Sequence, residues 1–352
     1  MTLEPTRIRL ARERAALSRS ALAASLGICE RELARAPEDL SLALADALDC
    51  APQYFRLPAT RGIDTERIFF RSPRRTSTAQ KVAAAALGRN GVELYHLITR
   101  NFRLPQTEIP ELCGFTPEDA AAQLRTEWDL GCGALPDLLH LLESHGVRVL
   151  SLPASLDAVK TFSFWEDGQA FIFLAAGSRN AQRLDMAHEL GHLLMHSSLG
   201  ENREQMATAE READEFAARL LLPSLSLQVR VSDSLQIPQL LVLEEHFGAP
   251  ATAILAHARA CGLLGDGNYR WLSQELALEP AAGHQQLVSR VFSLVFPSLQ
   301  LDHRASTARI ARELGQTAAQ IHELTFGQAF VVLDGGNLHQ AGEGLRGHLR
   351  AL

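Results

Sequence analysis

The stretch LDMAHELGHLLMH, residues 184–196, carries two histidines four positions apart, His188 and His192, with Glu189 directly after the first. Its apolar residues recur at helical spacing, so we expect a helix that is apolar away from the histidines. Side chains four residues apart project from one helical face, and two imidazoles there can hold one metal ion. The alternative is a pair of histidines that only cap a core helix.

A metal ion at this helix needs a third protein ligand. His196 shares the face, but it lies two turns, about 12 Å of helical rise, beyond His188, so we expect it behind the ligands or in a structural role. The next predicted helix, AEREADEFAARLLL at 209–222, has Glu210 and Glu212 on opposite sides of its buried stripe. Periodicity does not choose between them. Asp185 and Asp214 are candidates to support the imidazoles from behind, with surface salt bridges as the alternative.

Together, HELGHLLMH and EREADEFAARLLLP resemble the ImmA/IrrE family of zinc metallopeptidases. The resemblance implies a zincin-like core with a small sheet beside the H-E-x-x-H helix. It implies one zinc ion on His188, His192 and Glu212, with Glu189 as the general base. It also implies the substrate class, a partner repressor of the XRE type, whose cleavage after a stress signal such as DNA damage relieves repression.

Three segments before the motif predict short strands: VRVLSLP, TFSFWE and AFIFLAA, with EDG as a hairpin turn between the last two. We expect residues 170–174 to form an edge strand that pairs with an extended substrate. Most other segments have helical spacing. The predicted fold class is therefore α+β and mostly helical.

Residues 1–58 resemble an XRE-type helix-turn-helix module, on IRLARERAALSRSALAASLGI and LALADALDCAPQYF. Ser18 is a candidate N-cap and Gly27 a helix end. Residues 1–60 hold eight arginines and eight acids. Because phosphate attraction dominates DNA affinity, this neutral module leaves DNA binding and helical packing or dimerisation both open.

Residues 61–103 are basic, with nine Arg or Lys against three acids. Cations interleaved with rings are typical of surfaces that bind single-stranded nucleic acid, a candidate activator here. The candidate contacts are Arg67, Phe69, Phe70, Arg71, Arg74 and Arg75. The alternative is a linker that two phenylalanines anchor to the next domain.

Cys113 precedes Gly114 in a segment that resembles the cysteine switch of matrix metalloprotease pro-segments. A thiolate is a strong zinc ligand, so Cys113 is a candidate inhibitory ligand. A buried, inert cysteine is the alternative.

Composition limits the class of protein. The chain has 352 residues, a net charge of −7 and five scattered cysteines. It has no apolar run that approaches the length of about 18 residues needed to span a bilayer. These features favour a cytoplasmic protein without a membrane partner. We divide it into residues 1–58, 59–225 and 226–352, the last mainly helical and a candidate sensor. The predicted activity is zinc endopeptidase; the alternatives are a DNA-binding regulator or an antitoxin-like binding protein with a non-catalytic zinc site.

Overall fold

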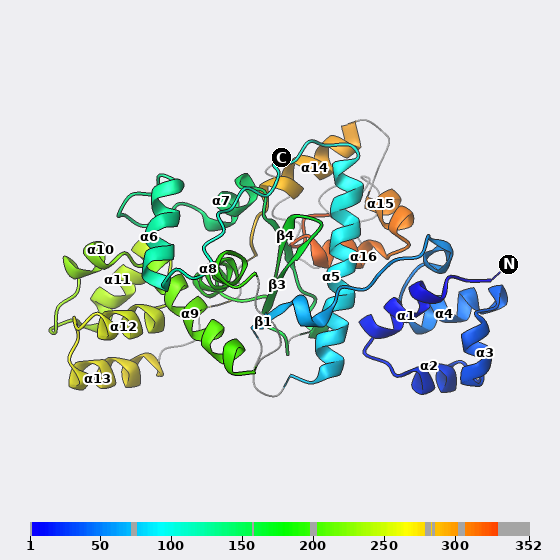
Figure 1. Cartoon of the computed structure of the whole chain (residues 1–352), viewed down its shortest axis with the longest axis horizontal. Helices are drawn as coiled ribbons and strands as arrows, with labels where there is room; N and C mark the ends of the chain where they lie inside the picture. Colours follow the sequence, from blue (N-terminus) through cyan, green and yellow to red (C-terminus); the bar gives the residue numbers. More distant parts are fainter. Residues whose placement is uncertain are drawn as a thin grey trace.

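The computed structural model describes residues 2–71, 76–156, 158–197, 203–278, 283, 286–301 and 307–329. Within these ranges the chain is mostly helical, and one small mixed sheet lies near the middle of the molecule (Figure 1). The architecture is α+β, as predicted. None of the described helices combines the length and apolar character needed to cross a membrane.

The N-terminal helices form a small bundle at one end of the molecule (Figure 1). They are α1 (Pro5–Arg14), α2 (Arg19–Ser25), α3 (Glu30–Arg35) and α4 (Ser41–Ala47). Ser18 caps α2 by accepting a hydrogen bond from the Ala21 amide, and Gly27 follows that helix with a φ of +69°. Leu22, Leu33 and Leu44 belong to a buried cluster centred on this bundle. The predicted cap and helix end are therefore confirmed.

The sheet has four short strands in the order β1-β3-β4-β2. They are β1 (Phe69–Arg71), β2 (Arg148–Ser151), β3 (Thr161–Glu166) and β4 (Gln169–Leu174). The β3–β4 hairpin turns at Asp167 and Gly168, whose φ values of +48° and +74° match the two-residue turns that hairpins favour. β4 pairs with β3 on one side and β2 on the other. The expectation that residues 170–174 form an edge strand is therefore wrong, because β2 occupies that edge.

Two helices enclose the sheet. The long helix α5 (Thr78–Thr99) lies so close to it that a Cβ on Gly91 would stand 2.6 Å from the Phe173 ring. On the other side, α8 (Arg179–Met195) packs against β3, β4 and α9 (Arg203–Leu221). Gly191 permits the close approach of α9, since a Cβ there would lie 2.9 Å from Phe216 Cδ1. The polar motif of α8 is thereby buried between the sheet and α9.

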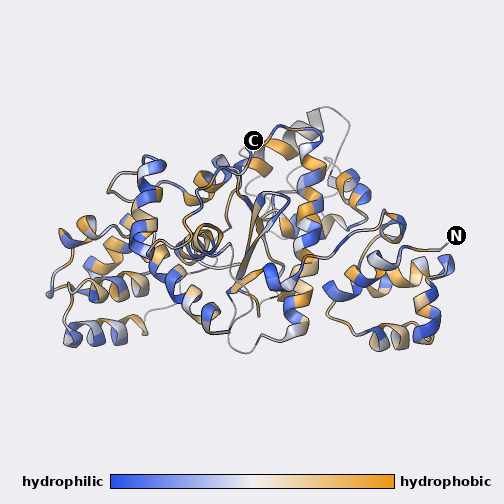
Figure 2. Ribbon diagram, viewed as in Figure 1, coloured by the Kyte–Doolittle hydropathy of each residue, from blue (hydrophilic) through white to orange (hydrophobic). Residues whose placement is uncertain are grey.

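The remaining helices surround this centre, and Figure 2 shows that they carry both hydrophobic and hydrophilic residues, as amphipathic helices do. They are α6 (Pro117–Glu127), α7 (Leu138–Ser144), α10 (Ser224–Gln228), α11 (Ile237–Phe247), α12 (Ala251–Ala260), α13 (Asp266–Leu276), α14 (Arg290–Leu301), α15 (Thr307–Leu314) and α16 (Ala318–Leu324). One buried cluster extends from Ile63 to Ala329. The division of the chain at residue 225 stays a prediction.

Candidate metal centre

Helix α8 brings three histidines to one buried face. His188 and His192 are completely buried, and His196, the residue after α8, is nearly so. The Nε2 atoms of His188 and His192 lie 3.1 Å apart. The i and i+4 spacing therefore produces the expected convergence of two imidazoles.

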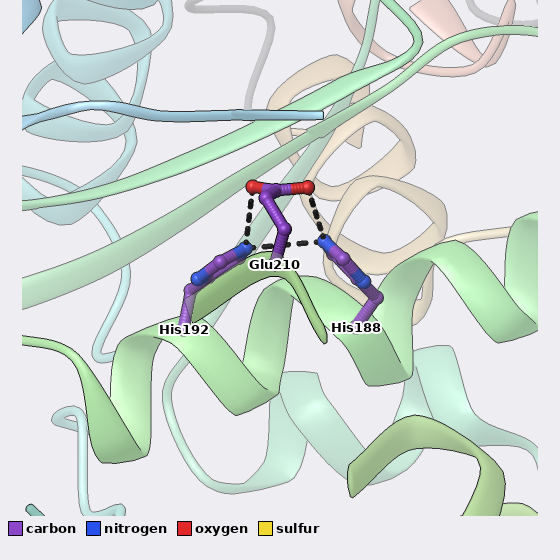
Figure 3. Close-up of side chains that lie close together, drawn as sticks. All are labelled: His188, His192 and Glu210. Carbon is purple, nitrogen blue, oxygen red and sulfur yellow. Dashed lines mark hydrogen bonds and ion pairs between the residues drawn. The ribbon is translucent and has the colours of Figure 1, made fainter. Parts of the chain in front are cut away.

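The third group at this point is the Glu210 carboxylate of α9 (Figure 3). Its Oε1 lies 3.2 Å from His192 Nε2, and its Oε2 lies 3.6 Å from His188 Nε2. The ligand atoms of the three residues all lie within 4.8 Å of one another. Two imidazole nitrogens and one carboxylate oxygen form the ligand set of many catalytic zinc sites.

The structure corrects the choice of carboxylate, because Glu210 and not Glu212 reaches the two imidazoles. Glu210 precedes Ala213 by three residues and Ala217 by seven, so it shares their buried helical face. Glu212 lies two residues further along and points to His196 instead, with Oε2 3.0 Å from His196 Nε2.

The hydrogen-bonding pattern fits a cation at this point. Asp214 Oδ1 lies 2.9 Å from His188 Nδ1, so the carboxylate accepts from Nδ1–H, and in the neutral imidazole His188 Nε2 then carries a lone pair. Glu210 Oε1 is shielded from solvent and has no hydrogen-bond partner. Lone pairs that face one another without a proton repel, and a divalent cation among them removes that repulsion.

Residues 142–258 match the family model of the M78 peptidases, described as the IrrE N-terminal-like domain. This M78 region includes α8, α9 and the whole ligand set. A comparison with curated proteins found no match. The match supports a peptidase of a metallopeptidase family and supports the predicted resemblance, while it leaves the N-terminal bundle outside.

Both imidazoles of the metal centre, His188 and His192, have a polar contact behind them. Asp214, which holds His188, also accepts from Arg71 Nη2 at 3.1 Å. Arg71 Nη1 donates to Asp185 at 2.8 Å. Asp214 therefore lies where it was predicted, whereas Asp185 pairs with Arg71 and supports no imidazole directly. Behind His192, Nδ1 lies 3.1 Å from His196 Nδ1.

Glu189, the general-base candidate of the M78 region, is completely buried and held by β3. Thr161 Oγ1 donates to Glu189 Oε1, and Ser163 Oγ donates to Oε2 at 2.6 Å. Burial raises the pKa of Glu189 to about 7, although the His188 charge and the two hydroxyl donors oppose the rise. Neither hydroxyl was predicted from the sequence. The alternation of small polar and aromatic residues in TFSFWE is the sequence feature that could have indicated Thr161 and Ser163.

Charge at the centre favours a cation. Burial alone would lower the pKa of His188, but hydrogen bonds with Asp214 and Glu210 outweigh it and raise that pKa to about 9. The two imidazoles hold the pKa of Glu210 well below its usual range, although burial opposes this shift. Burial lowers the pKa of His192. In the absence of a metal ion, a proton on His188 Nε2 thus takes the place of the cation beside Glu210.

The structure buries both aromatic residues that were predicted to contact nucleic acid. Phe69 is buried and stacks on His192, with ring centroids 4.7 Å apart and planes within 6°. Phe70 is buried on the opposite face of β1, against Phe162. Neither ring is free to stack on bases, so that expectation is wrong for both. They anchor the segment, as the alternative had it.

The basic members of that set differ among themselves. Arg71 is engaged by Asp185 and Asp214, and Arg67 is exposed. Arg74 and Arg75 lie outside the described residues.

Cys113 lies near the C-terminal end of α8. The amide of Leu112 donates to the Leu194 carbonyl at 2.8 Å, and Cys113 Sγ lies 3.4 Å from Ser197 Oγ. Among the described residues, the structure does not bring Cys113 into the group of His188, His192 and Glu210. The inhibitory contact between this thiol and a metal ion stays a prediction.

Proposed function

We propose that this chain is a zinc-dependent endopeptidase. The observation that carries the proposal is the convergence of His188, His192 and Glu210, from two packed helices, beside the buried carboxylate of Glu189. Three protein ligands of this type leave a coordination position open, as catalytic zinc requires. The M78 match supports the same activity.

The ion would supply Lewis-acid activation of a water molecule and of the peptide carbonyl. The chain's own contribution is proton transfer and positioning. Glu189 accepts the proton of the attacking water and returns it to the leaving amine nitrogen. Thr161 and Ser163 hold the two oxygens of this carboxylate and so fix its orientation. Asp214 fixes the ring of His188.

We propose a partner repressor of the XRE type as the substrate, and a stress signal such as DNA damage as the trigger. Support comes from the family resemblance and from the N-terminal bundle, in which α2 and α3 are joined by a short glycine turn. The burial of Phe69 and Phe70 removes them as contacts for single-stranded DNA, so this activator has to act elsewhere on the chain. Cys29, Cys50, Cys132 and Cys261 form no disulfide, which supports a cytoplasmic location.

A DNA-binding regulator is the second candidate. One observation favours it: α3 follows the turn after α2 and leaves most of its residues exposed, as a recognition helix does. Its exposed residues include Glu30 and Glu32 as well as Arg31 and Arg35, and this mixed charge is poor for phosphate attraction. Tight sequence-specific duplex binding by a protein without peptidase activity would establish this alternative.

The test compares the wild-type chain with Glu189→Gln. Each zinc-loaded protein is incubated with the XRE-type repressor encoded nearest to it, with and without single-stranded DNA, and fragments are identified by mass spectrometry. We expect cleavage by the wild type, and a rate about 10²- to 10⁴-fold lower in Glu189→Gln with unchanged zinc content. Equal rates in both proteins, or a wild type that binds no zinc, would overturn the proposal.

A further inference from the structure

The two imidazoles of the metal centre have different supports. His188 Nδ1 contacts the Asp214 carboxylate directly, at 2.9 Å. His192 Nδ1 contacts a second imidazole, that of His196, and the carboxylate of Glu212 lies beyond it, 3.0 Å from His196 Nε2. His196 is nearly buried, while the side chain of Glu212 is 44% exposed. A three-member chain therefore runs from the centre to the surface.

The order of donors along this chain follows from its outer end. An ionised carboxylate only accepts hydrogen bonds, so His196 Nε2 carries the proton that Glu212 accepts. In a neutral imidazole the other nitrogen is then an acceptor, which makes His196 Nδ1 the acceptor for His192 Nδ1–H. His192 Nε2 is left with its lone pair directed toward Glu210. This is the tautomer that a metal ion requires.

We propose that His196 and Glu212 form a positioning pair that holds His192 in its metal-binding tautomer and orientation. The inference rests on the proposed metal centre and concerns the support of one ligand. Phe69 fixes the plane of His192 by stacking, and His196 fixes rotation within that plane through Nδ1. Neither member of the pair is a ligand. The pair does for His192 what Asp214 does for His188.

The test measures zinc affinity by competition with a chromophoric chelator. His196→Phe keeps a ring of similar size and removes both nitrogens, and we expect it to raise the zinc Kd about 10- to 100-fold. His196→Asn restores an acceptor near Nδ1 and recovers most of that loss. Glu212→Ala raises the Kd about tenfold in the wild type. Glu215→Ala, on the same helix and also partly exposed, is the matched control with unchanged affinity.

The double variant separates a positioning pair from two independent structural roles. Because Glu212 acts only through His196, Glu212→Ala adds no further loss of affinity in the His196→Phe protein. Additive losses, or full zinc affinity in His196→Phe, would overturn the proposal. Circular dichroism establishes that each variant is folded before its affinity is measured.

A second readout is independent of metal and of peptidase activity. In ¹⁵N-labelled, metal-free protein, the His192 Nδ1–H gives a downfield proton signal that exchanges slowly with water, and His196→Phe abolishes it. An identical spectrum in that variant contradicts the contact. Failure of the proposed function looks different: the wild type cleaves no peptide or holds no zinc, while the dependence of this signal on His196 is unchanged.

Discussion

The two faces of the sheet serve different purposes. On the face toward α8, β3 presents Thr161 and Ser163 to Glu189, and β1 presents Phe69 and Arg71 to the metal centre and its supports. On the face toward α5, β1, β3 and β4 present phenylalanines that pack against one another. Successive residues of a strand alternate between the two faces. Residues that position the site therefore alternate with residues of the aromatic core along the same strand. Substitutions one position apart along these strands therefore act on different properties of the protein.

The strongest destabilisation should come from a substitution on the α5 face. Phe173 is completely buried and stacks on Phe162 with centroids 4.6 Å apart. Phe173→Ala should lower the free energy of unfolding by about 3–5 kcal/mol, because it leaves a cavity beneath α5. Urea denaturation followed by circular dichroism measures the change.

Phe115→Ala is the control, since this ring is 46% exposed, and its effect should stay below about 0.5 kcal/mol. If Phe173→Ala does not fold, Phe173→Leu leaves a smaller cavity and should lower the free energy of unfolding less than Phe173→Ala does. Equal effects at Phe173 and Phe115 would contradict the role of Phe173 in the aromatic core on the α5 face.

The next effect concerns the metal centre, where Glu210→Gln and Glu212→Gln form a matched pair two residues apart. Glu210→Gln replaces a charged ligand and should weaken zinc binding by more than about 100-fold. That factor is the largest loss of affinity expected when a residue that only supports a ligand is removed. Glu212→Gln keeps an acceptor for His196 and should weaken it by less than about tenfold. Zinc titration of both variants measures the contrast. The reverse order would restore Glu212 as the ligand.

These residues show how much the sequence could predict. The H-E-x-x-H helix, the hairpin turn, the cap at Ser18 and the α+β class follow from local patterns, and the structure confirms them. The choice between Glu210 and Glu212 depends on how α9 is rotated against α8, which periodicity does not fix. β1 was predicted to belong to a basic segment that contacts nucleic acid or serves as a linker, because three residues give no alternation to recognise. Its pairing with β3, far along the chain, defines it.

A smaller effect separates chemistry from stability on the α8 face. Ser163→Ala removes one of the two hydroxyl donors to the buried Glu189 carboxylate. The loss of a hydrogen bond to a charged group should lower the free energy of unfolding by about 1.5–3 kcal/mol. The cleavage rate should fall as well, because the orientation of Glu189 is less restricted, while zinc content stays at one ion per chain.

Ile172 is the cross-strand neighbour of Ser163 and serves as the control. Ile172→Val should cost about 0.5–1.5 kcal/mol without changing the rate per folded molecule. A Ser163→Ala protein with the wild-type rate would show that Thr161 alone positions the carboxylate.

The smallest effect lies at the hairpin that sets the register of both faces. Gly168 has a φ of +74°, which L-residues with a Cβ adopt only at a cost, although a Cβ there would meet no neighbouring atom. Gly168→Ala should therefore lower the free energy of unfolding by about 1 kcal/mol through backbone strain alone. Gly168→Asn, which tolerates this conformation better, should cost less. Urea denaturation of the two variants should show this order.

The same turn bears on the register of the β3–β4 pair. Because Phe162 pairs with Phe173 while Ser163 pairs with Ile172, a shift of the register by one residue would exchange the two faces. A loss of zinc affinity in Gly168→Ala would therefore mean that the turn sets the register of the metal centre, and we expect no such loss, since the β3–β4 ladder and the stacked rings also fix it.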